Sequence, residues 1–285
     1  MNLKRIILIS CLFLVSCSPL RLGYDYADWF MFWKLDGFFN LSTEQKEFLH
    51  PQIDQLLAWH KAEELPLYVS LLRQTQEKAM DGLSLSELNW VYTQTGRRVE
   101  KTMRRIIPNF SILLTTLDDQ QIERFKQNFS KQRATPSSDE KDESSEQFIK
   151  QVEQWVGELS DIQKTLVIQL RKSVPDISKQ RVLHNEDIRN TVISFIAQDH
   201  SAQAVEQKIL ELYLDYESTY SEEYNQQVAA QREAFKNMIL GIDRMLTPLQ
   251  RSYFLTRIDS LIGDIEGLEK KSNNRFFESI RRIVF

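Results

Sequence analysis

The side chains of this 285-residue chain that are best suited to chemistry are its four histidines and the acids near them. His60 is followed by two carboxylates at helical spacing, Glu63 and Glu64. A metal there would need a further ligand, and the neighbouring sequence contains no second histidine. We therefore interpret His60 as a structural residue that caps a helix or lies partly buried.

Patterns typical of enzymes are missing from the sequence. It contains no H-E-x-x-H, no G-x-S-x-G, no glycine-rich phosphate loop and no C-x-x-C. We therefore expect no catalytic residues, no metal and no cofactor, and we expect that the protein is not an enzyme.

Another group with chemical potential is a set of cations spaced for one face of a helix. These candidate headgroup-binding residues are Arg97, Arg98, Lys101, Arg104 and Arg105. Such a face could bind the phosphates of lipid headgroups or of lipopolysaccharide. It could also be a solvated face whose cations pair with acidic neighbours, which is the commoner case and the one we favour.

The N-terminus has the features of a secretory signal. Lys4 and Arg5 form a short positive segment, and an apolar run of about ten residues follows before Ser16 and Cys17. A helix that spans a bilayer needs about 20 apolar residues, so this run is too short to be a transmembrane anchor. We predict that residues 1–16 are a signal peptide.

The segment Leu14-Val15-Ser16-Cys17 resembles a lipobox, the pattern that bacterial lipoprotein processing enzymes read. The resemblance implies that Cys17 is the lipidation site, that it carries acyl chains such as palmitate and that the chain is cut before it. Ser18 stands where an aspartate would signal retention in the inner membrane. We therefore expect a protein that is anchored in the outer membrane by lipid and faces the periplasm.

The composition of the mature chain limits its partners and cross-links. Loss of Lys4 and Arg5 leaves 34 of the 36 basic residues against 40 acidic ones, a net charge of −6. This balance does not suggest nucleic acid binding. No disulfide is expected, because Cys11 leaves with the signal and Cys17 carries lipid.

Apolar residues recur with a helical period along most of the chain, and glycine and proline total only 15 residues. We predict an all-α, multi-helix bundle. The stretch 134–146 has no large apolar residue and is predicted to be a flexible linker. It would divide the chain into a lipidated tether (17–23), an N-terminal helical unit (24–133) and a C-terminal helical unit (147–285).

A short signature recurs at expected helix starts: Leu, then Ser, Thr or Asp, then two residues, then Gln. Its four copies begin at Leu41, Leu117, Leu159 and Leu246, and a near match begins at Leu85. The second residue can accept a hydrogen bond from the first helical turn, and the glutamine can reach back to the cap amide. Each half opens and closes with one copy, which indicates an internal duplication into two tandem units.

The densest aromatic cluster lies in 24–39, beginning seven residues after Cys17. It could rest on lipid as an interfacial aromatic belt. Alternatively, it could be a first helix that docks into the core, which we favour because Asp25, Asp28 and Asp36 resist burial in a headgroup layer. In that case Trp29 and Trp33 would be shielded from water.

Two resemblances to known families rest on these residues. Cys17 to Leu22, Ala27-Asp28-Trp29, Leu57-Ala58-Trp59-His60 and Glu63-Glu64-Leu65-Pro66 are similar to a family of uncharacterised proteobacterial lipoproteins. That resemblance implies lipidation, helices and an envelope location, but no activity. The Leu246 to Gln250 copy resembles the Leu-Thr-x-x-Gln repeats of periplasmic chaperones of the Spy and CpxP type, which implies that unfolded clients could be bound.

These observations together favour a non-enzymatic binding, scaffolding or chaperone-like role in the envelope. The partners would be the membrane, through the lipid anchor, and envelope proteins or lipids. A lipid- or lipopolysaccharide-binding protein is the alternative.

The anchor can be tested at Cys17. Cys17→Ser is expected to abolish incorporation of labelled palmitate, because serine lacks the thiol that receives the diacylglycerol. The measurement is metabolic labelling followed by fractionation of the cells. Labelled fatty acid on the variant, together with retention in the membrane fraction, would show that the lipoprotein interpretation is wrong.

Overall fold

The computed structural model describes residues 19–130, 140–198, 200–214 and 220–284, and this part of the chain contains helices but no strand. The prediction of an all-α, multi-helix protein is therefore confirmed. The helices are α2 (Pro19–Asp25), α3 (Ala27–Phe39), α4 (Thr43–Trp59), the π-helical turn η2 (His60–Glu64), α5 (Leu65–Lys78), α6 (Leu85–Thr115), α7 (Asp119–Ser130), α8 (Glu140–Val156), α9 (Asp161–Lys172), α10 (Ser178–Ile196), α11 (Ala202–Leu214), α13 (Glu222–Arg244) and α14 (Pro248–Val284).

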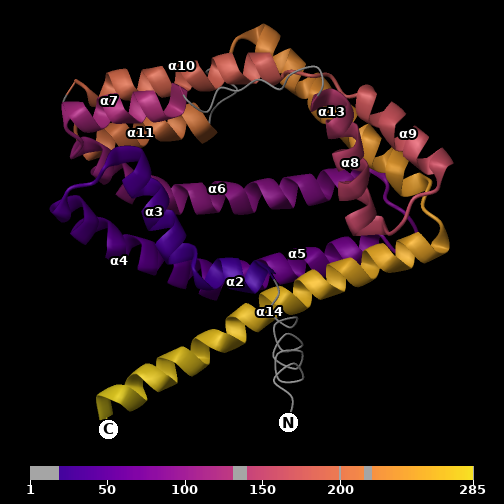
Figure 1. Cartoon of the computed structure of the whole chain (residues 1–285), viewed down its shortest axis with the longest axis horizontal. Coiled ribbons are helices and arrows are strands. Elements are labelled where there is room, and N and C mark those ends of the chain that lie inside the picture. Colours follow the sequence, from indigo (N-terminus) through magenta and orange to yellow (C-terminus); the bar gives the residue numbers. More distant parts are fainter. Residues whose placement is uncertain (1–18, 131–139, 199, 215–219, 285) are drawn as a thin grey trace, which may run out of the picture.

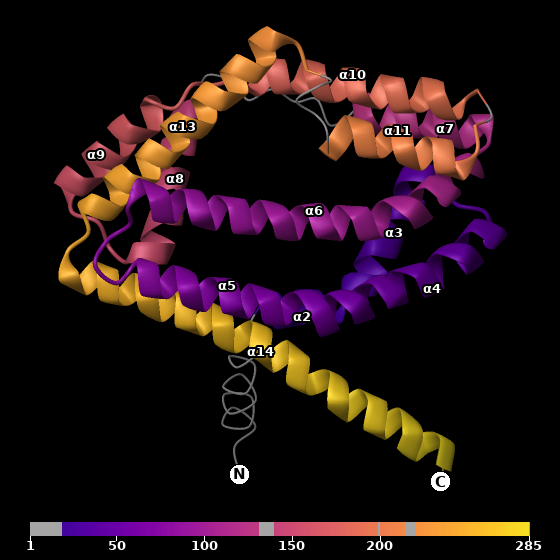
Figure 2. The same cartoon turned by 180° about the vertical axis from the view of Figure 1, so that it is seen from behind.

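The helices form an elongated frame around the long helix α6 (Figure 1). Helices α10 and α11 lie along one long side, and α2, α5 and α14 lie along the other. One end is built from α3, α4 and α7, and the other from α8, α9 and α13, as the view from behind also shows (Figure 2).

Three clusters of buried apolar side chains hold this frame together. The first joins α3, α4 and α6 to α11, and includes Phe39, Ile107 and Val205. The second joins α5 to α14 through residues such as Leu65 and Ile262. The third lies within the second half of the chain. Since two of the three clusters combine helices from both halves, the halves are not packed as two independent units.

The predicted linker falls partly outside the described residues. Residues 134–139 are not described, and residues 140–146 form the beginning of α8. The second part of the stretch is therefore helical in the structure.

Two corners of the frame are joined by Gln45 and Gln121, both buried (6% exposed each). The amide nitrogen of each donates to the amide oxygen of the other, at 3.0 Å from Gln45 and 2.7 Å from Gln121. Each also donates to the carbonyl that ends the helix at the opposite corner, Gln45 to Thr116 at 2.8 Å and Gln121 to Asn40 at 3.0 Å. We call this reciprocal pair the first glutamine clasp.

A second glutamine clasp joins Gln163 and Gln250 in the same way, at the corners α8–α9 and α13–α14. The two amides exchange hydrogen bonds of 2.8 and 3.0 Å. Gln163 also donates to the Met245 carbonyl at 3.0 Å and Gln250 to the Glu158 carbonyl at 2.7 Å.

The clasp glutamines also complete the helix caps that the sequence predicts. Their amide oxygens accept hydrogen bonds from the backbone amides of Ser42, Asp118, Ser160 and Thr247, at 2.9–3.1 Å. The side chains of these four caps in turn accept from the backbone amides of the glutamines. Every clasp glutamine thus donates at least twice and accepts twice, so the side-chain amides of these four residues are fully paired.

The near match that begins at Leu85 does not form the predicted helix cap. Helix α6 is capped by Ser84, not by Ser86, and Glu87 closes the capping box by accepting from the Ser84 amide at 3.0 Å. The sequence therefore predicted the cap two residues too late, because Ser84 and Ser86 both precede the apolar stripe.

The clasps can be tested by substitution. Gln121→Leu is expected to lower the free energy of unfolding by about 3 kcal/mol, because it leaves the Gln45 amide buried without its partner. The double variant with Gln45→Leu should cost less than the sum of the two single changes, since the two residues share one network. Urea denaturation followed by circular dichroism measures these values.

Gln226→Leu, on the exposed side of α13, is the matched control and should change stability by less than about 0.5 kcal/mol. Strict additivity of the two clasp substitutions would contradict a coupled amide pair.

Candidate functional site

The first described helix, α2, is bound to three other elements of the fold. The Tyr24 hydroxyl lies 3.1 Å from His60 Nδ1 and donates to the Leu57 carbonyl at 3.4 Å. Arg21 forms an ion pair of 3.4 Å with Asp264 on α14 and donates to the Gly263 carbonyl at 2.7 Å. The helix that follows the predicted lipidation site is thus held against η2 and α14 (Figure 2).

The π-helical turn η2 places His60 between two tyrosines. Its Nε2 atom lies 3.3 Å from the Tyr68 hydroxyl, while its other ring nitrogen meets Tyr24. Burial lowers the pKa of His60, and the nearby Glu64 carboxylate opposes this effect. Burial also raises the pKa of Tyr24 to about 12, with a further contribution from Tyr68. His60 is thus partly buried, as we expected.

Glu64, at the end of the same turn, is completely buried. Lys101 lies 2.8 Å from one of its carboxylate oxygens and Arg98 3.7 Å from the other. Hydrogen bonding to Glu64 raises the pKa of Lys101. The π-helical turn thus directs a carboxylate onto α6, and this ion-pair cluster joins α6 to the turn. Insertions of this kind in helices often occur at functional sites.

The structure separates the five cations that we considered for headgroup binding. Arg98 and Lys101 face Glu64, and Lys101 also lies 3.4 Å from Glu63. The remaining three differ in surroundings: Arg104 pairs with Glu100 at 2.8 Å, Arg105 lies over the Trp59 ring at 5.7 Å, and Arg97 is exposed. Pairing with carboxylates thus accounts for three of the five cations.

Helix α3 has one face that packs against the core and another that is exposed. Phe32, Leu35 and Phe38 pack against the first core cluster, and Phe39 is buried within it. On the other face Trp29, Phe30 and Trp33 are 62%, 49% and 53% exposed. We call these three residues the aromatic face. Our expectation that Trp29 and Trp33 are shielded was therefore wrong, although the segment docks by its opposite side.

The aromatic face is an ordered arrangement of rings. Trp29 and Trp33 stack with centroids 6.0 Å apart and planes inclined by 8°. Lys34 lies 5.6 Å from the Trp33 ring and 5.8 Å from the Phe30 ring. Exposed Tyr26 and Leu22 continue the apolar surface toward the N-terminus. An exposed apolar patch of this kind is typical of a surface that contacts a partner or a membrane.

Among the described residues, no helix is long and apolar enough to cross a bilayer. In that same part of the chain, no three or more acidic, histidine or cysteine side chains are grouped so that they could hold a metal ion.

The protein is all-α, and buried glutamine pairs join the corners between its helices. Residues 37–225 match a family of unknown function, DUF6279, and the chain belongs to that family. The matched region includes the π-helical turn, the ion-pair cluster and the first glutamine clasp. No curated protein and no solved structure matches the chain.

The buried state of His60 predicts a pH dependence of stability. Because the folded chain has the lower pKa at this position, the unfolded chain binds the proton first as the pH falls. The contribution of neutral His60 is thus fully present above the ordinary pKa of about 6.5 and is lost as the pH falls below it. The free energy of unfolding should therefore decrease more between about pH 7.5 and about pH 5 in the native sequence than in His60→Asn.

Denaturant titrations of both proteins at the two pH values give this difference directly. His184, whose pKa burial also lowers, is present in both proteins and cancels. An identical decrease in the two proteins would be inconsistent with the burial of neutral His60.

Proposed function

We propose that this protein is a lipid-anchored component of the bacterial envelope that acts by binding, and that its aromatic face rests on the membrane that holds the anchor. One observation carries the proposal: Trp29 and Trp33 are exposed only 12 and 16 residues after Cys17. Helices rise only about 1.5 Å per residue, so a lipid on Cys17 would keep these rings close to the bilayer surface.

The chemistry of the face suits a lipid interface. Tryptophan combines a large apolar ring with an N–H donor, and it is enriched where membranes meet water. Lys34 beside the rings adds a cation, which anionic lipids attract. Of the aspartates Asp25, Asp28 and Asp36, Asp36 is engaged elsewhere, because it accepts from the Leu41 amide at 3.0 Å and pairs with Lys46 at 3.1 Å, whereas Asp28 is exposed beside Trp29.

The attachment of α2 supports a defined orientation on the membrane. Its contacts through Arg21 and Tyr24 fix the start of the described chain against α14 and η2. A lipid joined to this helix by two residues would therefore position the whole frame and not only a flexible tail. Such a scaffold could hold envelope proteins or unfolded clients at the periplasmic side of the outer membrane.

The alternative, binding of lipid or lipopolysaccharide headgroups by Arg97, Arg98, Lys101, Arg104 and Arg105, has less support. Phosphates would have to compete with Glu64, Glu63 and Glu100 for three of these cations. The buried carboxylate of Glu64 is a strong competitor, since a buried charge deprived of its partner is costly.

The aromatic face can be tested with the full lipidated protein in vesicles whose acyl chains carry bromine, which quenches nearby tryptophan. We expect strong quenching for the native sequence. The variant Trp29→Ser with Trp33→Ser should lose most of it, because its remaining tryptophans lie on other elements.

Trp155→Ser removes an exposed tryptophan of α8 and serves as the matched control, which should keep the quenching. Equal quenching of the native protein and the Trp29 and Trp33 double variant would refute the proposed orientation, while leaving the lipid anchor itself to the labelling experiment.

A further inference from the structure

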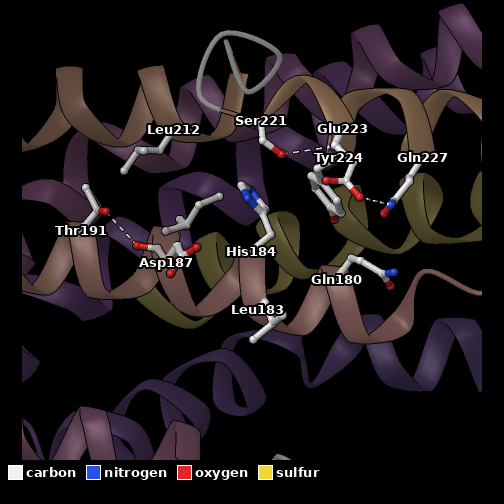
Figure 3. A pocket seen from close by; sticks show the side chains of 11 residues that line it. Gln180, Leu183, His184, Asp187, Thr191, Leu212, Ser221, Glu223, Tyr224 and Gln227 are labelled. Atoms are coloured by element: carbon white, nitrogen blue, oxygen red, sulfur yellow. Dashed lines mark hydrogen bonds between the residues drawn. The ribbon is translucent and has the colours of Figure 1, made fainter.

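A cavity of about 330 Å³ lies between α10 and the beginning of α13, far along the frame from the aromatic face (Figure 1, Figure 3). His184 and Asp187 line it from α10, and Glu223, Tyr224 and Gln227 line it from α13. Leu183 and Leu212 add apolar surface. Its volume is at the lower end of the range for small-molecule sites.

Aromatic rings hold His184 at the wall of this cavity. Its ring centroid lies 3.9 Å from that of Tyr220 and 4.9 Å from that of Tyr224. The Nε2 atom is buried and has no hydrogen-bond partner. Burial lowers the pKa of His184, and nearby Asp187 opposes this effect. Burial thus disfavours a positive charge on this imidazole.

Gln227 presents an acceptor that is also without a partner. Its amide nitrogen donates to Glu223 Oε1 at 3.3 Å, whereas its amide oxygen is buried and unpaired (Figure 3). A buried acceptor of this kind is costly unless a ligand or a water donates to it. The hydrogen bond to Glu223 orients the amide, and because the oxygen has no exposed surface in this structure, a donor would reach it after a small movement of the Gln227 side chain.

The charged residues that line the cavity are all acidic. Asp187 and Glu223 are carboxylates, and no lysine or arginine is among the lining residues that the structure describes. An anionic ligand would meet repulsion from both carboxylates and would find no cation. A ligand with N–H donors and a positive charge fits every one of these groups, and the Tyr224 ring can add a cation–π contact.

We propose that this cavity binds an alkylammonium group. The ammonium would donate to the Gln227 amide oxygen and lie close to Asp187 and Glu223, and its alkyl chain would contact Leu183 and Leu212. Such a group is present in a free polyamine and in the side chain of a lysine of another polypeptide. The site is independent of the lipid anchor and of the aromatic face.

Isothermal titration calorimetry with the full chain tests the proposal, using putrescine and Nα-acetyl-lysine-methylamide as probes. Butane-1,4-diol and succinate match putrescine in length but are neutral and anionic, and neither should bind. Binding of putrescine alone would indicate a free polyamine, and binding of the lysine derivative would indicate a polypeptide ligand. The resonances of the His184 ring should shift when a probe binds, which locates the site.

Asp187→Asn and Gln227→Leu should each weaken binding by about tenfold, the loss expected for one charged contact of about 1.4 kcal/mol. Gln226→Leu, one residue away on the exposed face of α13, should bind like the native chain. Equal affinity for putrescine and the diol would overturn the proposal, and so would unchanged affinity in variants that melt like the native protein. If a variant fails to fold, the proposal is tested by the native chain alone, which should bind putrescine or the lysine derivative but neither the diol nor succinate.

Discussion

A primary amide buried between helices must satisfy two N–H donors and two acceptor positions, and this requirement governs the architecture. Each clasp glutamine meets it only when two helical corners come together, because all partners of its side-chain amide except the cap residue belong to the opposite corner. A cap formed by Ser42 and Gln45 alone would leave amide groups without partners in an apolar setting. The clasps therefore select which corners meet: α3–α4 with α6–α7, and α8–α9 with α13–α14. The core clusters fill the space between the helices that are joined at these corners.

Much of this was predictable from local patterns, and the remainder was not. Helix caps and apolar periods are encoded in short stretches of sequence. The helices and the four glutamines that complete their caps can therefore be predicted from residue spacing. The two copies of the cap signature are 76 residues apart in the first half and 87 in the second, which also indicated that each half begins and ends with the same signature. The interleaving of the halves could not be predicted, because an apolar stripe such as that of α11 specifies burial but not the helix that covers it. At the start of α6 the sequence contains two candidate cap residues, because Ser84 and Ser86 both precede the apolar stripe, and the structure identifies Ser84 as the cap.

The candidate site was harder to predict for similar reasons. Aromatic residues occupy the whole circumference of α3, so the sequence alone did not distinguish the face that packs from the face that carries Trp29 and Trp33. The sequence His-Lys-Ala-Glu-Glu of η2 is compatible with an ordinary α-helix, and its π-helical form places Glu64 against Lys101, which is 37 residues away. Sequence reasoning did not single out His184, although Asp187 follows it at helical spacing, because its aromatic partners Tyr220 and Tyr224 are distant in the sequence.

The position of α14 in the chain has a consequence for how the protein is made. This helix is synthesised last among the described elements, yet it supplies Gln250 to the second clasp and the apolar residues that cover α5. Until it emerges from the ribosome, Leu65 and Val69 lack the part of their cover that α14 provides, and the Gln163 amide lacks Gln250. The nascent chain therefore exposes apolar surface until α14 has been made, and such surface favours aggregation and holding by chaperones.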